Sequence, residues 1–301
     1  MLEFDFGKKF IQPIAVGLGF FDCVHTGHRA VFEACRQLAA ETEAMPAAFT
    51  FRDVPAFGDK SGSAVYTYAE RLERFREEGV KVCISALFSQ VCGMSAGSFL
   101  KTLESEYHVR GIVVGSDFRF GAGAKGDAGL LQDFCRKKGI ALRVIEVGED
   151  KVSSSRIKRL LCEGALEEAN RLLGAPYRLS GKVVSGDSIG RTMQIRTANV
   201  LLPPEKFHIA EGVYAGYTTV CGRTFRSVTN IGPRPTRDSD DYRAETHLIG
   251  ADLDLYGQTL TVYLLRYLRP VKKFASMEEL KAQIARDIQS AAGSDGTGER
   301  A

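Results

Sequence analysis

Residues 14–35 read IAVGLGFFDCVHTGHRAVFEAC, and this stretch decides the fold of the first half of the chain. Its apolar run stops at Asp22, and apolar residues then recur every three or four positions. We therefore expect a strand, a tight turn and a helix. The helix face that packs back on the sheet comprises Val31, Phe32, Cys35, Leu38 and Ala39. The turn thus leads directly into the first turn of the helix.

Two histidines flank Gly27 in this turn. The N-terminus of a helix attracts anions through its free N–H groups and its dipole, and a glycine lets a phosphate chain approach the backbone. His25 and His28 can donate hydrogen bonds to a phosphorus centre as its charge builds. The alternatives are a chance surface pair and half of a metal site. Because two of the five histidines fall between a strand and a helix, the pattern favours phosphate binding.

The length and composition indicate a globular protein of two domains. The chain has 301 residues, of which 44% are hydrophobic and 26% are charged. It contains no apolar run of the roughly 18 residues that a membrane helix needs, and its N-terminus does not look like a signal peptide. We expect a cytoplasmic protein without a membrane partner. The net charge of +3 does not indicate a nucleic-acid partner, because small polyphosphates are enough to explain it.

The seven cysteines are scattered, and none forms C-x-x-C. Neither a zinc site nor a disulfide framework follows from this spacing. Most of them are expected to be small apolar residues in a reducing compartment.

Strands and helices are expected to alternate through the first half. After the opening unit, the expected strands are 46–51, 80–87, 111–115 and 140–147, and the expected helices are 68–78, 98–103 and 130–138. Alternation of this kind predicts a doubly wound, Rossmann-like α/β fold with a parallel sheet. Ligands of such a sheet collect outside the carboxyl ends of the strands.

One expected strand runs into the glycine-rich loop 114–127, VGSDFRFGAGAKGD. Asp117, Phe118 and Phe120 offer a carboxylate beside aromatic faces, which suits a flat heterocycle with polar edges. The loop could also be a plain surface loop, and Phe120 could equally be a core residue. We favour a substrate loop.

A second candidate segment is VSSSRIKRLL, which begins at residue 152. Its first serine can cap a helix, so that Ser154 and Ser155 face an anion together with Arg156 and Lys158. The alternative is solvated charge on a short helix.

The pattern of the sequence changes at residues 174–181, GAPYRLSG, after which helical spacing is no longer seen. Short runs rich in Val, Tyr and Thr follow as far as residue 268, which predicts a small antiparallel β-barrel. One closing helix follows, with Ser276 and Glu279 spaced as a capping box. We therefore expect a first domain at 1–174, a barrel domain at 175–290 and a disordered tail at 291–301.

Thr197 and Asn199 lie on the same side of an expected strand, because their spacing is two. A hydroxyl and an amide oxygen side by side can hold magnesium and a phosphate. The alternative is an ordinary polar strand edge.

The first half resembles the HxGH nucleotidylyltransferases. GFFDCVHTGH is similar to G-x-F-D-G-V-H-x-G-H of bacterial bifunctional riboflavin kinase/FAD synthetases, with Cys23 in place of glycine. VGSDFRFG is close to V-G-x-D-F-x-F-G. VSSSRIK is similar to I-S-S-T-x-I-R, with Ser155 for threonine and Lys158 for arginine. Lysine keeps the charge but loses the bidentate fork. The P-H-P of that family is absent, since FTFRDVP has Asp53 and Val54 before its proline.

The second half resembles flavokinases of the same family. RTAN is similar to P-T-A-N, with Arg196 for proline and Gln194 for a glycine two residues earlier, and NIGPRPT matches N-I-G-x-R-P-T. The segment that starts at Glu245 resembles E-x-H-x-x-x-x-x-x-D-L-Y-G. The resemblance implies that Glu245 is the general base for the ribityl hydroxyl of riboflavin. Without the resemblance, Glu245 would be read as a solvated strand carboxylate.

The resemblance implies a transferase that phosphorylates riboflavin to FMN and then adenylylates FMN to FAD, with Mg²⁺ and with ATP as co-substrate. Its implied partners are riboflavin, FMN, FAD and ATP. The implied catalytic residues are His25, His28 and Glu245, and the implied metal ligands are Thr197 and Asn199. The implied nucleotide or phosphate contacts are Gly19, Phe21, Asp22, Gly27, Ser154, Ser155, Arg156, Lys158, Gly190 and Arg191. The implied flavin contacts are Asp117, Phe118, Phe120 and Arg234.

Three other functions fit parts of the sequence. The departures at Cys23, Gln194, Arg196 and the missing P-H-P motivate a flavin-binding or nucleotide-binding carrier, or an enzyme with one active half. A tRNA-acting HxGH enzyme fits the first half only, and the β-rich second half argues against it.

Overall fold

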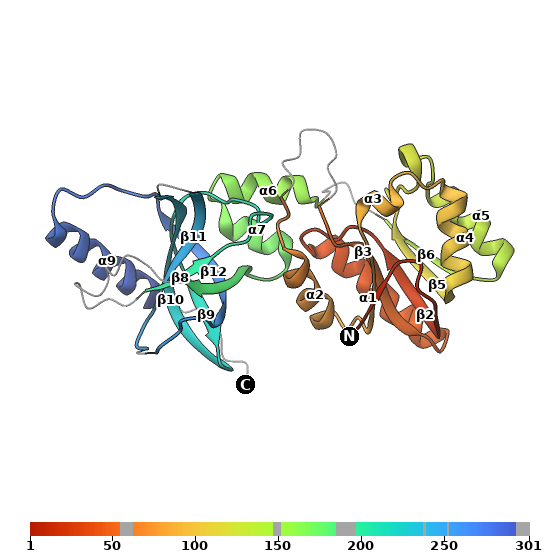
Figure 1. The fold of residues 1–301 in the computed structure, drawn as a ribbon, viewed down its shortest axis with the longest axis horizontal. Helices are drawn as coiled ribbons and strands as arrows, with labels where there is room; N and C mark the ends of the chain where they lie inside the picture. Colours follow the sequence, from red (N-terminus) through yellow and green to blue (C-terminus); the bar gives the residue numbers. More distant parts are fainter. Residues whose placement is uncertain (55–62, 147–151, 185–196, 237–238, 252, 293–301) are drawn as a thin grey trace. The chain divides into compact units, whose positions relative to one another are not determined.

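The computed structural model describes residues 1–54, 63–146, 152–184, 197–236, 239–251 and 253–292. The chain divides into two compact units, Met1–Ser154 and Ser155–Ala301 (Figure 1). The division falls at the start of helix α6 (Ser154–Cys162), and α7 (Leu166–Leu173) also belongs to the second unit. The expected boundary at 174 lies after these helices. They group with the barrel because α7 packs on its strands β7 (Tyr177–Val184) and β12 (Thr259–Arg269).

The first unit contains a six-stranded sheet of order β1-β4-β3-β2-β5-β6. All neighbouring strands are parallel, which confirms the predicted doubly wound fold. The strands are β1 (Leu2–Asp5), β2 (Phe10–Leu18), β3 (Met45–Phe51), β4 (Val82–Ala86), β5 (Tyr107–Gly115) and β6 (Ala141–Ile145). Strand β1 was not among the expected strands, and it extends the sheet at the β4 edge.

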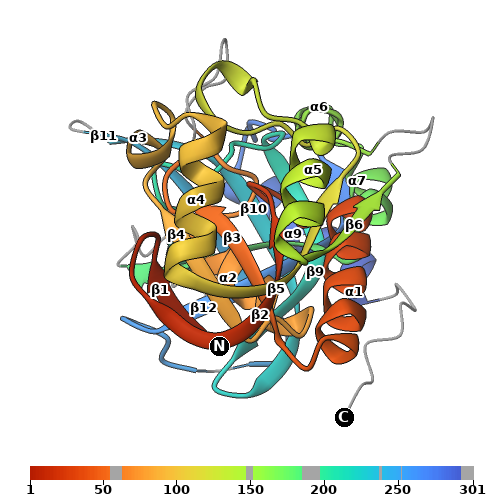
Figure 2. The ribbon, with the colours of Figure 1, turned by 90° about the vertical axis from the view of Figure 1, so that its right-hand side faces the viewer.

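Helices cover both faces of this sheet. On one face, Ala15 and Ala48 pack with residues of α1 and α2, and on the other face Ile14 and Val16 pack with residues of α4 and α5. Figure 2 views the unit from the α4 and α5 side. The helices are α1 (Thr26–Glu41), α2 (Tyr68–Glu77), α3 (Phe88–Val91), α4 (Ala96–Glu106) and α5 (Ala128–Lys138).

The strand order contains one switch point. From β2 the chain builds outward through β3 and β4, and it then returns to add β5 and β6 on the other side of β2. At such a point the connections after two adjacent strands leave in opposite directions, which opens a crevice at their carboxyl ends. The turn after β2 carries the histidines, and the loop after β5 carries Asp117.

The second unit is a closed antiparallel barrel of order β10-β11-β8-β7-β12-β9, as predicted. Its interior includes hydroxyl pairs between strands, such as Thr229 and Thr246 with oxygens 3.1 Å apart. The strands are β7 (Tyr177–Val184), β8 (Ala198–Leu201), β9 (Gly212–Val220), β10 (Arg223–Thr236), β11 (Ser239–Leu248) and β12 (Thr259–Arg269).

Helix α9 (Met277–Ala292) packs on strands β9 and β10. Ser276 Oγ accepts a hydrogen bond from the Glu279 backbone N–H at 3.2 Å, as the capping spacing predicts. The Asp287 carboxylate, which is buried, anchors the helix to Arg269 at 2.7 Å. The helix continues to Ala292, so its end overlaps the start of the expected tail at 291. None of the helices in the described part of the chain is long and apolar enough to cross a membrane.

Candidate active sites

The two histidines of the β2–α1 turn form one stacked pair. His25 is the N-cap of α1, and its Nδ1 accepts a hydrogen bond from the His28 backbone N–H at 3.2 Å. The two rings lie parallel, with centroids 3.6 Å apart and planes at 13°. Both imidazoles therefore stand at the positive end of a helix that spans 16 residues.

The backbone of this turn is strained. Phe21 and Val24 have φ angles of 53° and 45°, a region that bulky and β-branched residues rarely adopt, and both side chains are buried. The segment before α2 holds the turn in place. The Val65 backbone N–H donates a hydrogen bond to Asp22 Oδ1 at 2.9 Å. Asp22 O also accepts from the Tyr66 N–H at 3.3 Å. The structure thus gives Asp22, expected as a nucleotide contact, a role in fixing the turn.

Two glycines keep the turn open. A Cβ at Gly19 would lie 2.9 Å from the Phe21 ring, and a Cβ at Gly27 would lie 3.1 Å from Cε1 of His25. A larger residue at Gly27 would therefore press on the histidine pair. The Phe21 ring in turn packs edge-on against His28 at 5.2 Å.

Burial keeps both imidazoles neutral near pH 7. Desolvation lowers the pKa of His25 to about 4, and the nearby Asp117 carboxylate opposes this only in part. Burial, with His25 alongside, lowers the pKa of His28 well below its ordinary value. The pair can therefore donate N–H hydrogen bonds to phosphate oxygens at physiological pH without carrying a charge.

The loop after β5 places the Asp117 carboxylate near His25. Asp117 is exposed and lies close enough to His25 to act on its pKa. Phe118 is half-buried and stacks on Phe120 with centroids 5.5 Å apart. Phe120 is only 8% exposed and packs on Phe99 in the core, so of its two expected roles the structure shows the packing role.

A buried arginine that the sequence analysis did not identify binds the carboxyl ends of β2 and β3. Arg71 of α2 is fully buried, and it donates to Phe20 O at 3.0 Å, to Thr50 Oγ1 at 2.8 Å and to Phe51 O at 2.7 Å. These acceptors follow or end strands β2 and β3. Burial lowers the pKa of Arg71 to about 10, opposed by the Asp22 carboxylate. Arg71 is thus a positioning residue for the β2–α1 turn.

The boundary between the two compact units lies within the serine segment, between Ser154 and Ser155. Ser154 ends the first unit, and its Oγ lies 3.3 Å from the Cys23 sulfur. The other three phosphate candidates, Ser155, Arg156 and Lys158, belong to the second unit. There Arg156 pairs with Glu168 at 3.0 Å, and the Lys158 ammonium lies over the Phe207 ring at 5.2 Å.

A second cluster of polar side chains forms on the barrel. Glu245 of β11 is the direct register partner of Asn199 on β8 and of Asn230 on β10. These three side chains form a row across adjacent strands. Thr246, next to Glu245, points to the barrel interior, so Glu245 faces the other side.

The amide oxygen of Asn199 is buried, and among the described residues it has no hydrogen-bond partner. Thr197, two residues earlier, is exposed. The register of β8, β10 and β11 therefore brings a carboxylate and two amides to one face of the barrel. Gly190 and Arg191, expected as nucleotide contacts, lie outside the described residues. Arg234, expected as a flavin contact, lies in β10 with a side chain outside the described part.

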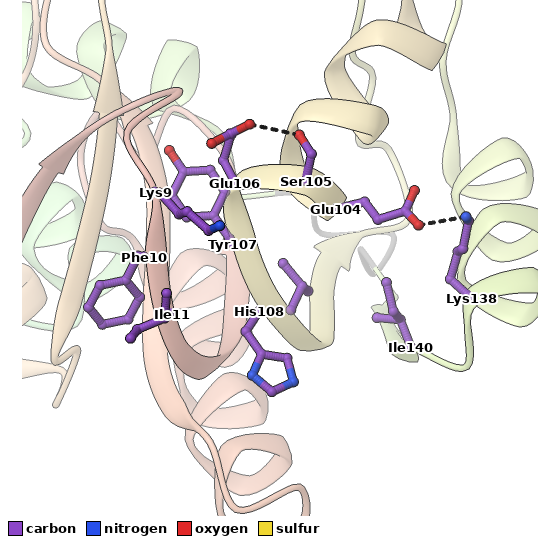
Figure 3. A pocket seen from close by; sticks show the side chains of 11 residues that line it. Lys9, Phe10, Ile11, Glu104, Ser105, Glu106, Tyr107, His108, Lys138 and Ile140 are labelled. Atoms are coloured by element: carbon purple, nitrogen blue, oxygen red, sulfur yellow. Dashed lines mark hydrogen bonds and ion pairs between the residues drawn. The ribbon is translucent and has the colours of Figure 1, made fainter.

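A pocket of about 410 Å³ lies elsewhere in the first unit (Figure 3). Its lining includes Phe10 at the start of β2 and Tyr107 at the start of β5, and an ion pair joins Glu104 to Lys138 at 2.5 Å on its wall. It opens at the amino ends of the parallel strands. The histidine turn follows the carboxyl end of β2, so this pocket is separate from the candidate nucleotide site.

The fold and the two clusters define a protein class: a Rossmann-like nucleotide-binding unit followed by a kinase-type β-barrel. A profile of the FAD synthetase family matches residues 8–156, and one of the riboflavin kinase family matches residues 173–294. The chain belongs to the family of bifunctional riboflavin kinase/FMN adenylyltransferases, as the following relatives show.

A bifunctional riboflavin kinase/FMN adenylyltransferase of Escherichia coli is 34% identical over 279 residues, which cover 90% of this chain and 89% of the relative. Relatives of the same description from Haemophilus influenzae and Listeria monocytogenes are 31% and 30% identical, over 94% and 91% of this chain. The alignments cover 95% of the Haemophilus influenzae protein and 90% of the Listeria monocytogenes protein. A crystal structure described as a macrolide-efflux protein from Streptococcus pneumoniae aligns with a TM-score of 0.87 at 27% identity, over 98% of this chain and all of that one.

Proposed function

We propose that the chain makes FMN from riboflavin at the barrel row and FAD from FMN at the histidine turn, using one ATP in each reaction. The family profiles for the two activities match separate parts of the chain. The observation that carries the proposal is that each part also contains its own polar cluster, the stacked His25–His28 pair in one and the Asn199–Glu245 register pair in the other.

In the adenylyl transfer, the FMN phosphate would attack the α-phosphorus of ATP and release pyrophosphate. His25 and His28 would donate hydrogen bonds as negative charge builds on the phosphate oxygens, together with the N–H groups at the start of α1. Asp117 would orient the imidazole of His25 and hold substrate. No covalent enzyme intermediate is required, because positioning and electrostatic stabilisation suffice for such transfers.

In the kinase reaction, Glu245 would accept the proton of the ribityl hydroxyl as this oxygen attacks the terminal phosphorus of ATP. Thr197 and Asn199 fit a magnesium ion, since both offer oxygen donors and the buried Asn199 oxygen has no partner among the described residues. Magnesium bound there would neutralise charge on the ATP phosphates. The carboxylate would thus lie beside the phosphate-binding residues on the same face.

The proposed cellular setting is a reducing one, the cytoplasm. All seven cysteines are free thiols, three of them exposed, and free thiols persist where disulfides are kept reduced.

Two single substitutions test the assignment of residues. Glu245→Gln should reduce formation of FMN from riboflavin by about 100-fold or more, because a general base is lost, while FAD formation from supplied FMN continues. His25→Asn should show the reverse pattern. Products are separated by chromatography after incubation with ATP and magnesium. Loss of both activities in either variant, or of neither, would refute the assignment.

A further inference from the structure

We infer that Cys23, His25 and His28 form a binding site for a zinc-class transition metal, and that metal bound there switches off FAD formation. The switching part rests on the proposed role of the two histidines in adenylyl transfer. One candidate ligand atom from each of the three residues lies within 4.8 Å of the other two. Cys23 and His25 belong to the turn between β2 and α1, and His28 lies in the first turn of α1.

The three side chains lie near one another but must rotate to bind one metal. Zinc–sulfur and zinc–nitrogen bond lengths imply ligand-to-ligand distances of about 3.3–3.8 Å in a tetrahedral site. The observed upper limit of 4.8 Å exceeds this by about one ångström, which side-chain rotation can supply. The imidazoles stack face to face with centroids 3.6 Å apart, so one ring must rotate out of the stack before a nitrogen of each can point at one ion.

The present contacts of His28 and Cys23 bear on metal binding. The Nδ1 atom of His28 is buried and has no hydrogen-bond partner among the described residues. The Cys23 side chain is fully buried, and its sulfur contacts the Ser154 hydroxyl at 3.3 Å, a distance typical of a weak thiol hydrogen bond. Metal binding would satisfy the orphaned nitrogen and exchange this weak contact for a metal–sulfur bond.

The donor set selects the metal. One thiolate and two imidazoles favour zinc and its neighbours in the transition series, whereas magnesium prefers oxygen ligands and keeps its waters. The thiol of Cys23 would lose its proton to solvent as the metal–sulfur bond forms. Three protein ligands leave a fourth tetrahedral position for water or for a phosphate oxygen.

The site can act as a switch because it uses both histidines of the adenylyl-transfer site. A metal held by the two imidazoles would remove the hydrogen-bond donors that the transition state needs. The riboflavin kinase cluster on the barrel contains none of the three ligands. With metal bound, the enzyme should therefore convert riboflavin to FMN but not FMN to FAD.

Metal binding is tested on the full chain, with Cys23→Ala as the key variant and Cys92→Ala as the matched control. Cys92 is an exposed thiol of the same unit, so its loss tests adventitious binding. Cobalt(II) chloride alone is the spectroscopic probe, because thiolate ligation gives a charge-transfer band in the near ultraviolet. We expect one cobalt equivalent with this band in wild type and Cys92→Ala. Cys23→Ala should lose the band, and its zinc affinity, measured by competition with a chromophoric chelator, should fall roughly tenfold or more.

The switch is tested in zinc-buffered assays with excess magnesium and ATP. We expect zinc to suppress FAD formation from FMN in wild type but not in Cys23→Ala, and to leave FMN formation from riboflavin unchanged in both. A missing cobalt band, or binding unaffected by Cys23→Ala, would overturn the metal site. Metal binding without inhibition would overturn the switch alone. Full FAD formation by metal-free His25→Asn would instead overturn the proposed function on which the switch rests.

Discussion

At the scale of single residues, the chemistry proposed for the first unit depends on imidazoles kept neutral by burial. A doubly protonated histidine pair with rings 3.6 Å apart would repel itself, so protonation of one imidazole disfavours protonation of the other. Neutral imidazoles at a helix N-terminus can turn their N–H groups toward a phosphate without a change of protonation during the reaction. Burial lowers the pKa of His25, and a backbone hydrogen bond and then the exposed Asp117 carboxylate oppose this in part.

This arrangement predicts a pH dependence of stability. Below the ordinary histidine pKa of 6.5 the unfolded chain takes up a proton that native His25, with a pKa of about 4, does not. Stability is therefore complete above pH 6.5 and falls as the pH drops toward 4. Between pH 7 and pH 5, wild type should lose about 2 kcal/mol more unfolding free energy than His25→Asn. Urea unfolding at the two pH values measures this, and equal losses would contradict it.

The sequence identified the histidines, but not the residues that support them. Positive φ at Phe21 and Val24 is invisible in a sequence, because neither residue type favours that conformation. A charged residue on a helix is usually solvated, so the helical spacing around Arg71 did not indicate its burial. The search for C-x-x-C missed the association of Cys23 with the histidines, because here the third ligand comes from the same turn at a different spacing.

At the scale of elements, the histidine turn is held by its neighbours α2 and β3 as much as by β2 and α1. Arg71 joins α2 to the ends of two strands, and the segment before α2 binds Asp22. The strained turn thus persists because several elements determine its shape together.

Removal of the Arg71 guanidinium should loosen this edge of the sheet. Arg71→Met removes three hydrogen bonds of a buried guanidinium, and of the acceptors Phe20 O keeps another donor, the Thr50 hydroxyl. We therefore expect the first unit to lose about 3 kcal/mol of stability. Arg76→Met on the same helix breaks only an exposed ion pair with Glu3 and should cost less than about 1 kcal/mol. Hydrogen exchange of the β2 and β3 amides measures both changes. Equal effects would show that Arg71 has no special role.

Most elements could be predicted from periodicity and glycine positions. The parallel sheet follows from alternation, and α5 stops before Gly139 as expected. Strand β1 has four residues without a clear pattern, and its pairing with β4 is a long-range contact that local sequence does not encode. Strand β5 begins at Tyr107, four residues before the expected start, since its first half alternates buried and exposed residues in place of a continuous apolar run.

At the scale of the whole molecule, one chain contains two units of different architecture, a parallel sheet and a closed barrel. Each unit contains its own compact core, so each is expected to fold alone. The register that joins Glu245 to Asn199 lies wholly within the barrel. Family resemblance implied that both residues serve the kinase reaction, but spacing alone could not bring them together, because they are far apart in sequence.

A truncated chain tests this independence. A fragment of residues 155–301 should phosphorylate riboflavin at a rate within about threefold of the full chain, because all elements of the barrel unit are retained. Fragment 175–301 lacks α6 and α7 and loses the contact of Asn170 with Tyr177, so it should be less stable. FMN formation and thermal unfolding of both fragments provide the readout. An inactive but folded 155–301 fragment would show that the kinase site needs the first unit.

The most direct test of two separate sites is complementation between full-length variants. His25→Asn and Glu245→Gln are incubated singly and together with riboflavin, ATP and magnesium, and FAD is measured by chromatography. We predict that neither variant alone makes FAD from riboflavin, and that the mixture does, because FMN made by the His25→Asn chain is used by the Glu245→Gln chain. A mixture that still forms no FAD, although each variant keeps its one activity on supplied substrate, would show that the two sites cannot work separately.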